Sequence, residues 1–161
     1  MKGYYRDPEQ TAAAFRDGWF ITGDLVKRDP EGFYYFVARK KDIIRKRGEN
    51  ISGADLDRVI GLHPDVAEAA AIAVPSELGE DEILVAVVTR AGATLNASDI
   101  GEWCARHLAP INMPRYVVFV DSLPHTPTQR VAKFKLKNDR ELLARAVDLQ
   151  GTDSGTARSQ A

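Results

Sequence analysis

The feature that most constrains the fold is a nearly continuous apolar run, Ile83–Val88. A strand exposed on one face alternates apolar with polar residues, whereas an unbroken run is typical of a central strand covered on both faces. Both faces of the sheet therefore need helices. The chain supplies further apolar strands at Val66–Val74 and Tyr116–Val120, and helices are expected after Ser52 and Asn96.

Two cap signals indicate where the helices begin. The side chains of Ser52 and Asn96 can accept hydrogen bonds from a helix N-terminus, and each precedes an apolar stripe with helical spacing. A last helix is expected from Lys137. The order helix, strand, strand, helix, strand, helix predicts an α+β fold, a small domain with a roughly three-stranded sheet packed against helices.

The first 38 residues follow a different pattern. A short helix is expected at Pro8, which Asp7 can cap, and a β-hairpin over Leu25–Val37 turns at Asp29–Gly32. This segment offers no sheet for its many aromatic residues, so they are expected either to contact another surface or to fold back onto the domain. We divide the chain near Arg39, with this β-hairpin segment preceding the small domain.

Composition narrows the class of protein. The 22 Lys and Arg residues against 23 Asp and Glu leave a net charge of -1, which argues against binding nucleic acid or an anionic membrane. No apolar run is long enough to span a bilayer. The single Cys104 excludes an internal disulfide or a cysteine-built zinc site, so no metal site is expected, and it fits a reducing, cytoplasmic location. The polar residues 148–161 are expected to be a disordered tail.

Two short stretches carry candidate chemistry. In Thr22-Gly23-Asp24 the glycine allows a tight backbone, and the carboxylate can accept hydrogen bonds from a pair of ligand hydroxyls. Taken alone, this tripeptide is also consistent with an ordinary turn. The second stretch, Arg39–Arg47, concentrates cations at the junction between the two parts of the chain.

Three motifs in one order and spacing indicate a family. Gly18–Leu25, Arg39–Asp42 with Gly48–Ser52, and Leu123–Thr128 together resemble the late motifs of the adenylate-forming acyl-CoA synthetases. The resemblance is closest to the fatty-acid and crotonobetaine/carnitine-CoA ligase-like branch and covers residues 1–145. It implies a two-step ligase, in which a carboxylate attacks ATP to give an acyl-adenylate and pyrophosphate, and the thiol of CoA then displaces AMP.

The resemblance also implies a domain organisation. In that family a large N-terminal domain holds most of the ATP and acyl pocket, and a small C-terminal domain moves between the two steps. Residues 1–38 would be the end of the large adenylation domain and residues 39–147 the mobile domain. ATP with Mg²⁺, CoA and a carboxylic acid would be substrates of the complete enzyme, with none tightly bound to this chain. The expected partner is the large domain, in the same longer chain or separate; neither nucleic acid nor a membrane span is expected.

Individual roles follow from the same resemblance. Asp24 would hold the ribose hydroxyls of ATP, and Arg39 would bind near the same ribose and phosphate region. Lys41 would be the hinge residue about which the small domain rotates. The segment that lines the CoA pantetheine tunnel corresponds to Gly48, Glu49 and Asn50. The neighbouring cations can meet the CoA phosphates, although a solvated cationic face is the simpler interpretation for any one of Lys40, Arg45, Lys46 and Arg47.

Two positions depart from the family pattern. The family carries glycine and then the lysine that bridges the substrate carboxylate and the α-phosphate, but this chain has Gln129 and Arg130. Arginine keeps the positive charge, but its planar fork does not reproduce a compact ammonium. Arg130 is therefore one catalytic candidate, and Lys133 is either its alternative or a structural neighbour. Ala38 also stands where glycine usually precedes the arginine.

Two functions from different classes remain open. The first is the C-terminal part of an ATP-dependent acyl-CoA ligase, inactive on its own because no glycine-rich phosphate loop or acyl pocket precedes Thr22. The second is a non-catalytic module that binds CoA or a protein. The pair Gln129-Arg130 favours the second, whereas Asp24 and Arg39 favour the first. The acyl substrate is not specified by these residues.

Overall fold

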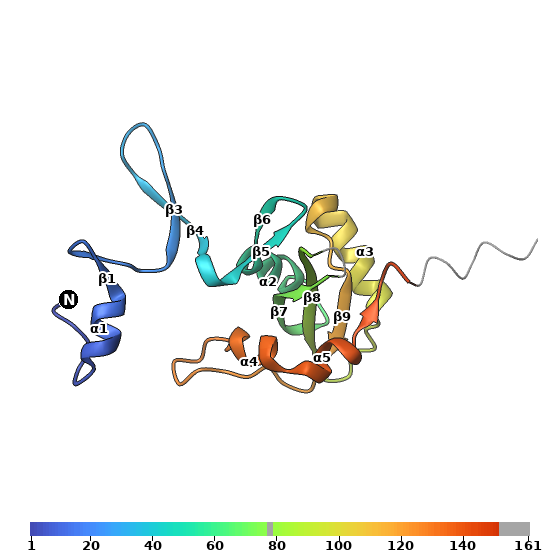
Figure 1. Cartoon of the computed structure of the whole chain (residues 1–161). Helices are drawn as coiled ribbons and strands as arrows, with labels where there is room; N and C mark the ends of the chain where they lie inside the picture. The colour runs from blue at the N-terminus through green and yellow to red at the C-terminus, as the bar shows by residue number, and fades with distance from the viewer. Residues whose placement is uncertain (77–78, 152–161) are drawn as a thin grey trace, which may run out of the picture. The chain divides into compact units, whose positions relative to one another are not determined.

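The computed structural model describes residues 1–76 and 79–151, and its chain forms two compact units. The first unit is Met1–Lys41, and the second begins at Asp42. The second unit is built on a four-stranded sheet with helices packed against it (Figure 1). The α+β class predicted from the sequence is therefore confirmed, with one more strand than expected.

The sheet has the strand order β10-β9-β8-β7. Strand β7 (Val66–Pro75) pairs antiparallel with β8 (Asp81–Thr89), and β8 pairs parallel with β9 (Tyr116–Phe119). The last strand, β10 (Val147–Asp148), pairs antiparallel with β9. A parallel pair requires a crossover, which here contains α3 (Ala97–His107) and the short 3₁₀ helix η2 (Pro110–Asn112).

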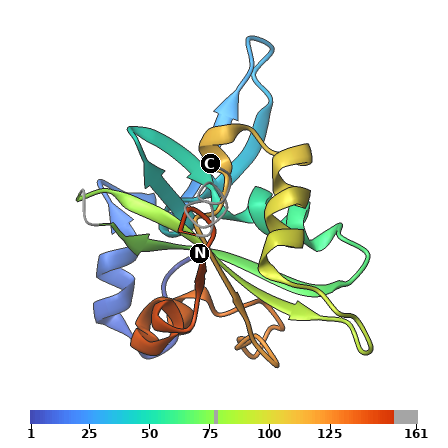
Figure 2. The same cartoon turned by 90° about the vertical axis from the view of Figure 1, so that its right-hand side faces the viewer.

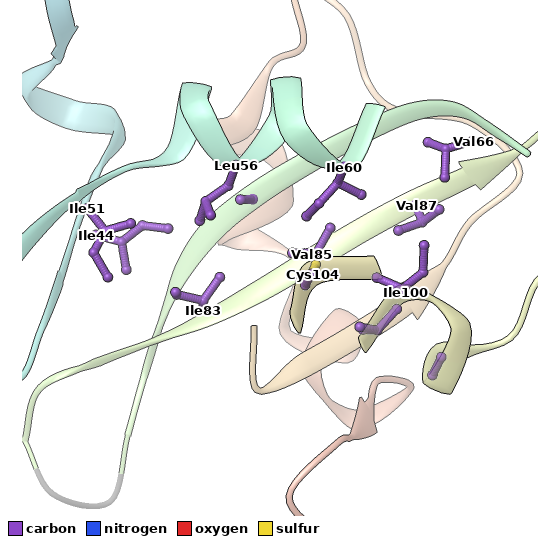
Figure 3. Close-up of a cluster of buried hydrophobic side chains, with 13 residues drawn as sticks. Ile44, Ile51, Leu56, Ile60, Val66, Ile83, Val85, Val87, Ile100 and Cys104 are labelled. Atoms are coloured by element: carbon purple, nitrogen blue, oxygen red, sulfur yellow. The ribbon is translucent and has the colours of Figure 1, made fainter. Parts of the chain in front are cut away.

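Strand β8 is buried on both faces, as its apolar run predicts. Its odd-numbered residues face a cluster that includes Leu56 and Ile60 of α2 (Gly53–Gly61) and Ile100 and Cys104 of α3 (Figure 3). Its even-numbered residues face a second cluster, closed by α4 (Lys133–Asn138) and α5 (Arg140–Ala144). The two pairs of helices thus lie on opposite faces of the sheet (Figure 2).

Both predicted helix caps are confirmed. The Ser52 hydroxyl accepts a hydrogen bond from the Asp55 N–H at 3.3 Å. The Asn96 side chain accepts from the Asp99 N–H at 3.1 Å, and the Asp99 carboxylate accepts from the Asn96 N–H at 2.9 Å, which makes a complete capping box. Local side-chain chemistry therefore sets the start of α2 and of α3.

The predicted C-terminal region is wrong in two respects. The helix expected from Lys137 is replaced by two short helices, because Asp139 adopts an extended conformation and caps α5 by accepting from the Glu141 N–H. The tail expected at 148–161 also begins too early. Asp148 belongs to β10, and Leu149 donates its N–H to the Arg115 carbonyl at 2.8 Å. Residues 152–161 lie outside the described residues.

The first unit consists of short elements. Helix α1 (Pro8–Ala14) is capped by Asp7, as predicted, and is followed by the small hairpin of β1 (Phe15–Arg16) and β2 (Trp19–Phe20). The predicted second hairpin is also present, as β3 (Asp24–Arg28) and β4 (Tyr34–Arg39). Its aromatic side chains are largely exposed in this chain: Phe33, Tyr34, Tyr35 and Phe36.

A third hairpin opens the second unit. The 3₁₀ turn η1 (Lys40–Asp42) leads into β5 (Ile43–Lys46), which pairs antiparallel with β6 (Glu49–Ser52). Ile44 and Ile51 pack into the same core cluster as α2 and α3, so this hairpin is fixed to the sheet domain. Among the described residues, no helix combines the length and the apolar character needed to cross a bilayer.

We expect the two glycines of α2 to respond oppositely to alanine. A Cβ at Gly53 would lie 2.8 Å from the Asp42 carbonyl oxygen and 3.2 Å from that of Ala71, and neither backbone atom can move cheaply. Gly53→Ala should lower the free energy of unfolding by about 1–3 kcal/mol. Gly61 has open space at the same position, so Gly61→Ala should be neutral or stabilising by up to about 1 kcal/mol. Urea denaturation followed by circular dichroism measures both, and equal losses would contradict the prediction.

The contact that holds β10 should depend on pH. Arg115 donates to the Asp148 carboxylate from Nε at 3.1 Å and from Nη2 at 3.0 Å, and these hydrogen bonds hold the Asp148 pKa below its usual value. Because this pKa is lower in the folded chain than in the unfolded chain, the ionised carboxylate stabilises the fold above about pH 4, the pKa of the unfolded state. This stabilisation is lost as the pH falls through the pKa of the folded state.

Asp148→Asn should therefore lower the free energy of unfolding at pH 7, by less than about 1 kcal/mol because the pair is partly exposed. Near pH 2 the variant and the natural chain should unfold alike. The control is Asp121→Asn, which removes an exposed carboxylate with no ion pair in the described part of the chain. A loss for Asp148→Asn that persists unchanged at pH 2 would rule out this ion-pair explanation.

Candidate functional site

The first group of candidate residues lies at the open end of the β3–β4 hairpin. Asp24 and Arg39 are register partners across the two strands, and the Arg39 Nε lies 3.0 Å from the Asp24 Oδ1. The Thr22 hydroxyl accepts from the Asp24 N–H at 3.1 Å, and Gly23, with φ of 75°, accepts from the Lys40 N–H at 2.8 Å. The tripeptide is thus a tight turn that brings a carboxylate and a guanidinium together.

A hollow of about 400 Å³ opens beside this pair. It is lined by residues of the first unit only: Thr22, Gly23, Arg39, Lys40 and Lys41. Three cationic side chains and a polar turn suit an anionic ligand, while the second oxygen of the neighbouring Asp24 carboxylate can accept hydrogen bonds from hydroxyl groups. The residues around the hollow are therefore compatible with an anionic ligand.

The β5–β6 hairpin presents the second group. Its two-residue loop, Arg47 and Gly48, has φ values of 50° and 79°, the pattern of a type I′ turn. This turn places Gly48, Glu49 and Asn50 on the exposed surface. The N–H groups of Arg45 and Arg47 donate to the carboxylates of Asp81 and Glu80.

The cationic stretch of the sequence is not one solvated face. Lys46 is only 4% exposed, and its Nζ lies 3.0 Å from the Glu82 carboxylate and donates to the Met113 carbonyl at 3.0 Å. Neither interpretation of Lys46 agrees with this burial, because its side chain is not solvated and its ammonium is already bound within the domain. Arg45 and Arg47 remain exposed.

The third group is the loop between Pro124 and Ala132. Thr126 organises it, because its N–H donates to the Arg130 carbonyl at 2.8 Å and its hydroxyl accepts from the Arg130 N–H at 3.2 Å. The loop is closed at its base by the Ala132 N–H, which donates to the Pro124 carbonyl at 2.7 Å. Gln129 has φ of 60°, a left-handed conformation that glycine adopts without strain.

The two candidate catalytic cations are in different environments. Arg130 is exposed on this loop. Lys133, at the start of α4, is 11% exposed, and its Nζ lies 2.6 Å from Oδ2 of Asp57 on α2. Asp57 was not among the candidate residues predicted from the sequence. No local signal could have identified it, because Asp55, on the other side of the buried Leu56, has an exposed side chain.

Two other kinds of site receive no support from the part of the chain that the structure describes. No group of three or more His, Cys, Asp or Glu side chains there could hold a metal ion. Burial raises the pKa of Cys104 to about 11, so this thiol is not a nucleophile near neutral pH. The candidate chemistry therefore rests on the three groups above.

Comparison with known proteins defines the class. Residues 55–130 match the AMP-binding enzyme C-terminal domain. This segment is thus similar to the C-terminal domain of AMP-binding enzymes, and several relatives that match the chain are CoA ligases for different acids. Their names do not single out the fatty-acid and crotonobetaine/carnitine branch.

Three relatives illustrate the similarity. The oxalate–CoA ligase of Arabidopsis thaliana is 39% identical over 132 residues, which are 82% of this chain and 26% of that protein. The crystal structure of ATP-bound MatB from Rhodopseudomonas palustris is 37% identical, with a TM-score of 0.73 over 85% of this chain and 27% of that one. The o-succinylbenzoate CoA synthetase of Bacillus subtilis, in complex with the acyl-adenylate OSB-AMP, is 31% identical. Its TM-score is 0.76 over 87% of this chain and 28% of that one. The chain thus spans between 26% and 28% of these relatives' lengths.

We expect Gln129→Gly to stabilise the chain by up to about 1 kcal/mol. Glycine relieves the strain of the left-handed conformation, about 1–2 kcal/mol, and this gain is somewhat larger than the backbone entropy that glycine loses on folding. Thr128→Gly, at the neighbouring position without a positive φ, should instead destabilise. Urea denaturation of the two variants checks the opposite signs. A loss of stability in Gln129→Gly would show that the strain is not stored at this residue.

Proposed function

We propose that this chain is the C-terminal part of an ATP-dependent acyl-CoA ligase. The observation that carries the proposal is the Asp24–Arg39 pair, held at 3.0 Å beside a hollow lined by Arg39, Lys40 and Lys41. A carboxylate for ribose hydroxyls next to cations for phosphates is the arrangement that ATP requires. The complete enzyme would convert a carboxylate, ATP and CoA into acyl-CoA, AMP and pyrophosphate through an acyl-adenylate.

We assign the remaining roles within that reaction. Arg130 would contact the substrate carboxylate and the α-phosphate during adenylation, because its guanidinium is exposed on a structured loop. Gly48, Glu49 and Asn50 would line the path of the CoA thiol, where the exposed glycine lets a ligand approach the backbone closely. Lys41, the last residue of the first unit, would be the hinge.

The domain roles belong to the same proposal. Residues 1–38 would complete the large adenylation domain, whose surface would cover the exposed aromatics of β4. Residues 39–147 would form the mobile domain. We place the enzyme in the cytoplasm, with ATP bound as its Mg²⁺ complex, and assign it to the fatty-acid and crotonobetaine/carnitine-like branch on the motifs of this chain. The acyl pocket would lie in the large domain, so the chain alone should be inactive.

A second candidate is a non-catalytic module that binds CoA or a protein. It is favoured by one observation, the pair Gln129-Arg130 at the place where the family has glycine and lysine. Arginine cannot present the compact charge of an ammonium. The two candidates differ in a simple way, because only the ligase must support formation of an acyl-adenylate.

A hybrid enzyme tests the proposal. In it this chain replaces the matching segment of the Bacillus subtilis o-succinylbenzoate CoA synthetase, which supplies a large domain. We expect the hybrid to form acyl-adenylate from o-succinylbenzoate and ATP, and thioester once CoA is added, whereas the isolated chain forms neither. Asp24→Ala should lower the adenylation rate by about 100-fold or more, because the ribose loses its carboxylate.

Further variants separate the two steps. Gly48→Trp should impair thioester formation while leaving adenylation intact, and the exposed control Asp121→Asn should leave both steps unchanged. Arg130→Lys should retain or raise the adenylation rate. A hybrid that folds and binds CoA but makes no adenylate, even with Arg130→Lys, would reject the ligase and leave the binding module.

A further inference from the structure

The loop that carries Arg130 is attached to the domain at both of its ends. At the first end, the His125 Nε2 lies 3.2 Å from the Glu68 carboxylate on β7. At the second end, the Lys133 Nζ lies 2.6 Å from the Asp57 carboxylate on α2. Between them the two arms of the loop are joined by a β-bridge from His125 to Val131.

The Lys133–Asp57 contact is the more enclosed of the two. Its side chains are 11% and 26% exposed, whereas those of His125 and Glu68 are 29% and 42% exposed. The other oxygen of the Asp57 carboxylate accepts from the Ala71 N–H at 2.6 Å. A Cβ on Gly53 would lie 3.1 Å from the Lys133 Nζ, so this ammonium lies close to the start of α2.

The Asp57 carboxylate is largely removed from water where it meets Lys133. Burial raises the pKa of Asp57 even though the Lys133 ammonium opposes the rise, so loss of hydration outweighs the attraction of the partner. Buried ion pairs can often be replaced by apolar residues without loss of stability. What a 2.6 Å contact does provide is a fixed position for the chain that bears it.

We propose that Lys133 is a positioning residue for Arg130. It acts through Asp57 to fix the C-terminal end of the loop, while Glu68 fixes the N-terminal end through His125, and Lys133 itself takes no part in the chemistry. The functional half of this inference rests on the proposed function, in which Arg130 contacts the reacting carboxylate and phosphate. The structural half, that the ion pair orders the loop, stands without it.

Trypsin tests the structural half in the whole chain, because it cleaves after Arg130. Lys133→Met, of similar length and without charge, should raise the cleavage rate at Arg130 by about tenfold, through more frequent local opening. Cleavage at Arg106, in the last turn of α3 on the opposite face of the sheet, reports opening elsewhere in the domain in the same sample. The control Lys135→Met removes an exposed lysine from the same helix and should change neither rate. An equal rise at Arg106 and Arg130, or no rise at Arg130, would overturn the proposal.

The hybrid enzyme tests the functional half with a double-mutant cycle. Lys133→Met and Asp57→Asn should each lower the adenylation rate by about 10–100-fold, the effect of misplacing a reacting group. The double variant should be no slower than either single one, since both remove the same contact. The KM for ATP and thioester formation from supplied acyl-adenylate should stay unchanged.

The outcomes of the cycle are distinguishable. A much larger loss for Lys133→Met than for Asp57→Asn would make Lys133 a catalytic residue and overturn its positioning role. Equal rate losses in adenylation and in thioester formation, together with faster cleavage at Arg106, would show that the ion pair only stabilises the domain. This outcome would also overturn the proposal. If the unmodified hybrid is inactive while cleavage at Arg130 still responds to Lys133→Met, the proposed function fails and the ordering of the loop by Lys133 is upheld.

Discussion

The burial of β8 on both faces is the constraint on which the rest of the domain depends. Ile83, Val85 and Val87 are fully buried on one face and Leu84 and Ala86 on the other. A strand of this kind is stable only if both faces are kept from water, so the chain must return helices to each side. Helices α2 and α3 cover one face, and α4 and α5 cover the other. The Arg130 loop and the β5–β6 hairpin are held in place by this arrangement.

Most of the sheet domain could be predicted from the sequence, because its signals are local. Each apolar strand is indicated by its own residues, and Ser52 and Asn96 cap the helices that directly follow them. These helices and strands therefore form where expected. Strand β10 could not be predicted in this way. Val147–Asp148 is too short for a periodic pattern, and it becomes a strand through its pairing with β9 and the contact from Arg115. Tertiary partners decide the structure of such segments.

In the candidate site, too, the contacts between residues far apart in the sequence could not be predicted. The pair Asp24–Arg39 was assigned to one ligand from sequence motifs, and the structure brings the two side chains together. Lys46 and Lys133 look in the sequence like the cations around them, yet each is bound to a carboxylate from a distant part of the chain, Glu82 and Asp57. The number of charges along a stretch does not report which of them face solvent. Burial and partners distinguish them, and both arise only in the fold.

The short strand β10 also determines which backbone the sheet exposes. It pairs with β9, whose other side is already paired with the buried β8. Without β10, the unpaired N–H and C=O groups of β9, a strand rich in β-branched and aromatic residues, would form an open sheet edge. Such edges add strands from other molecules and lead to aggregation. Strand β10 covers Tyr116 and Val117 of this edge, so a shortened version of the domain that ends before Val147 would expose their backbone.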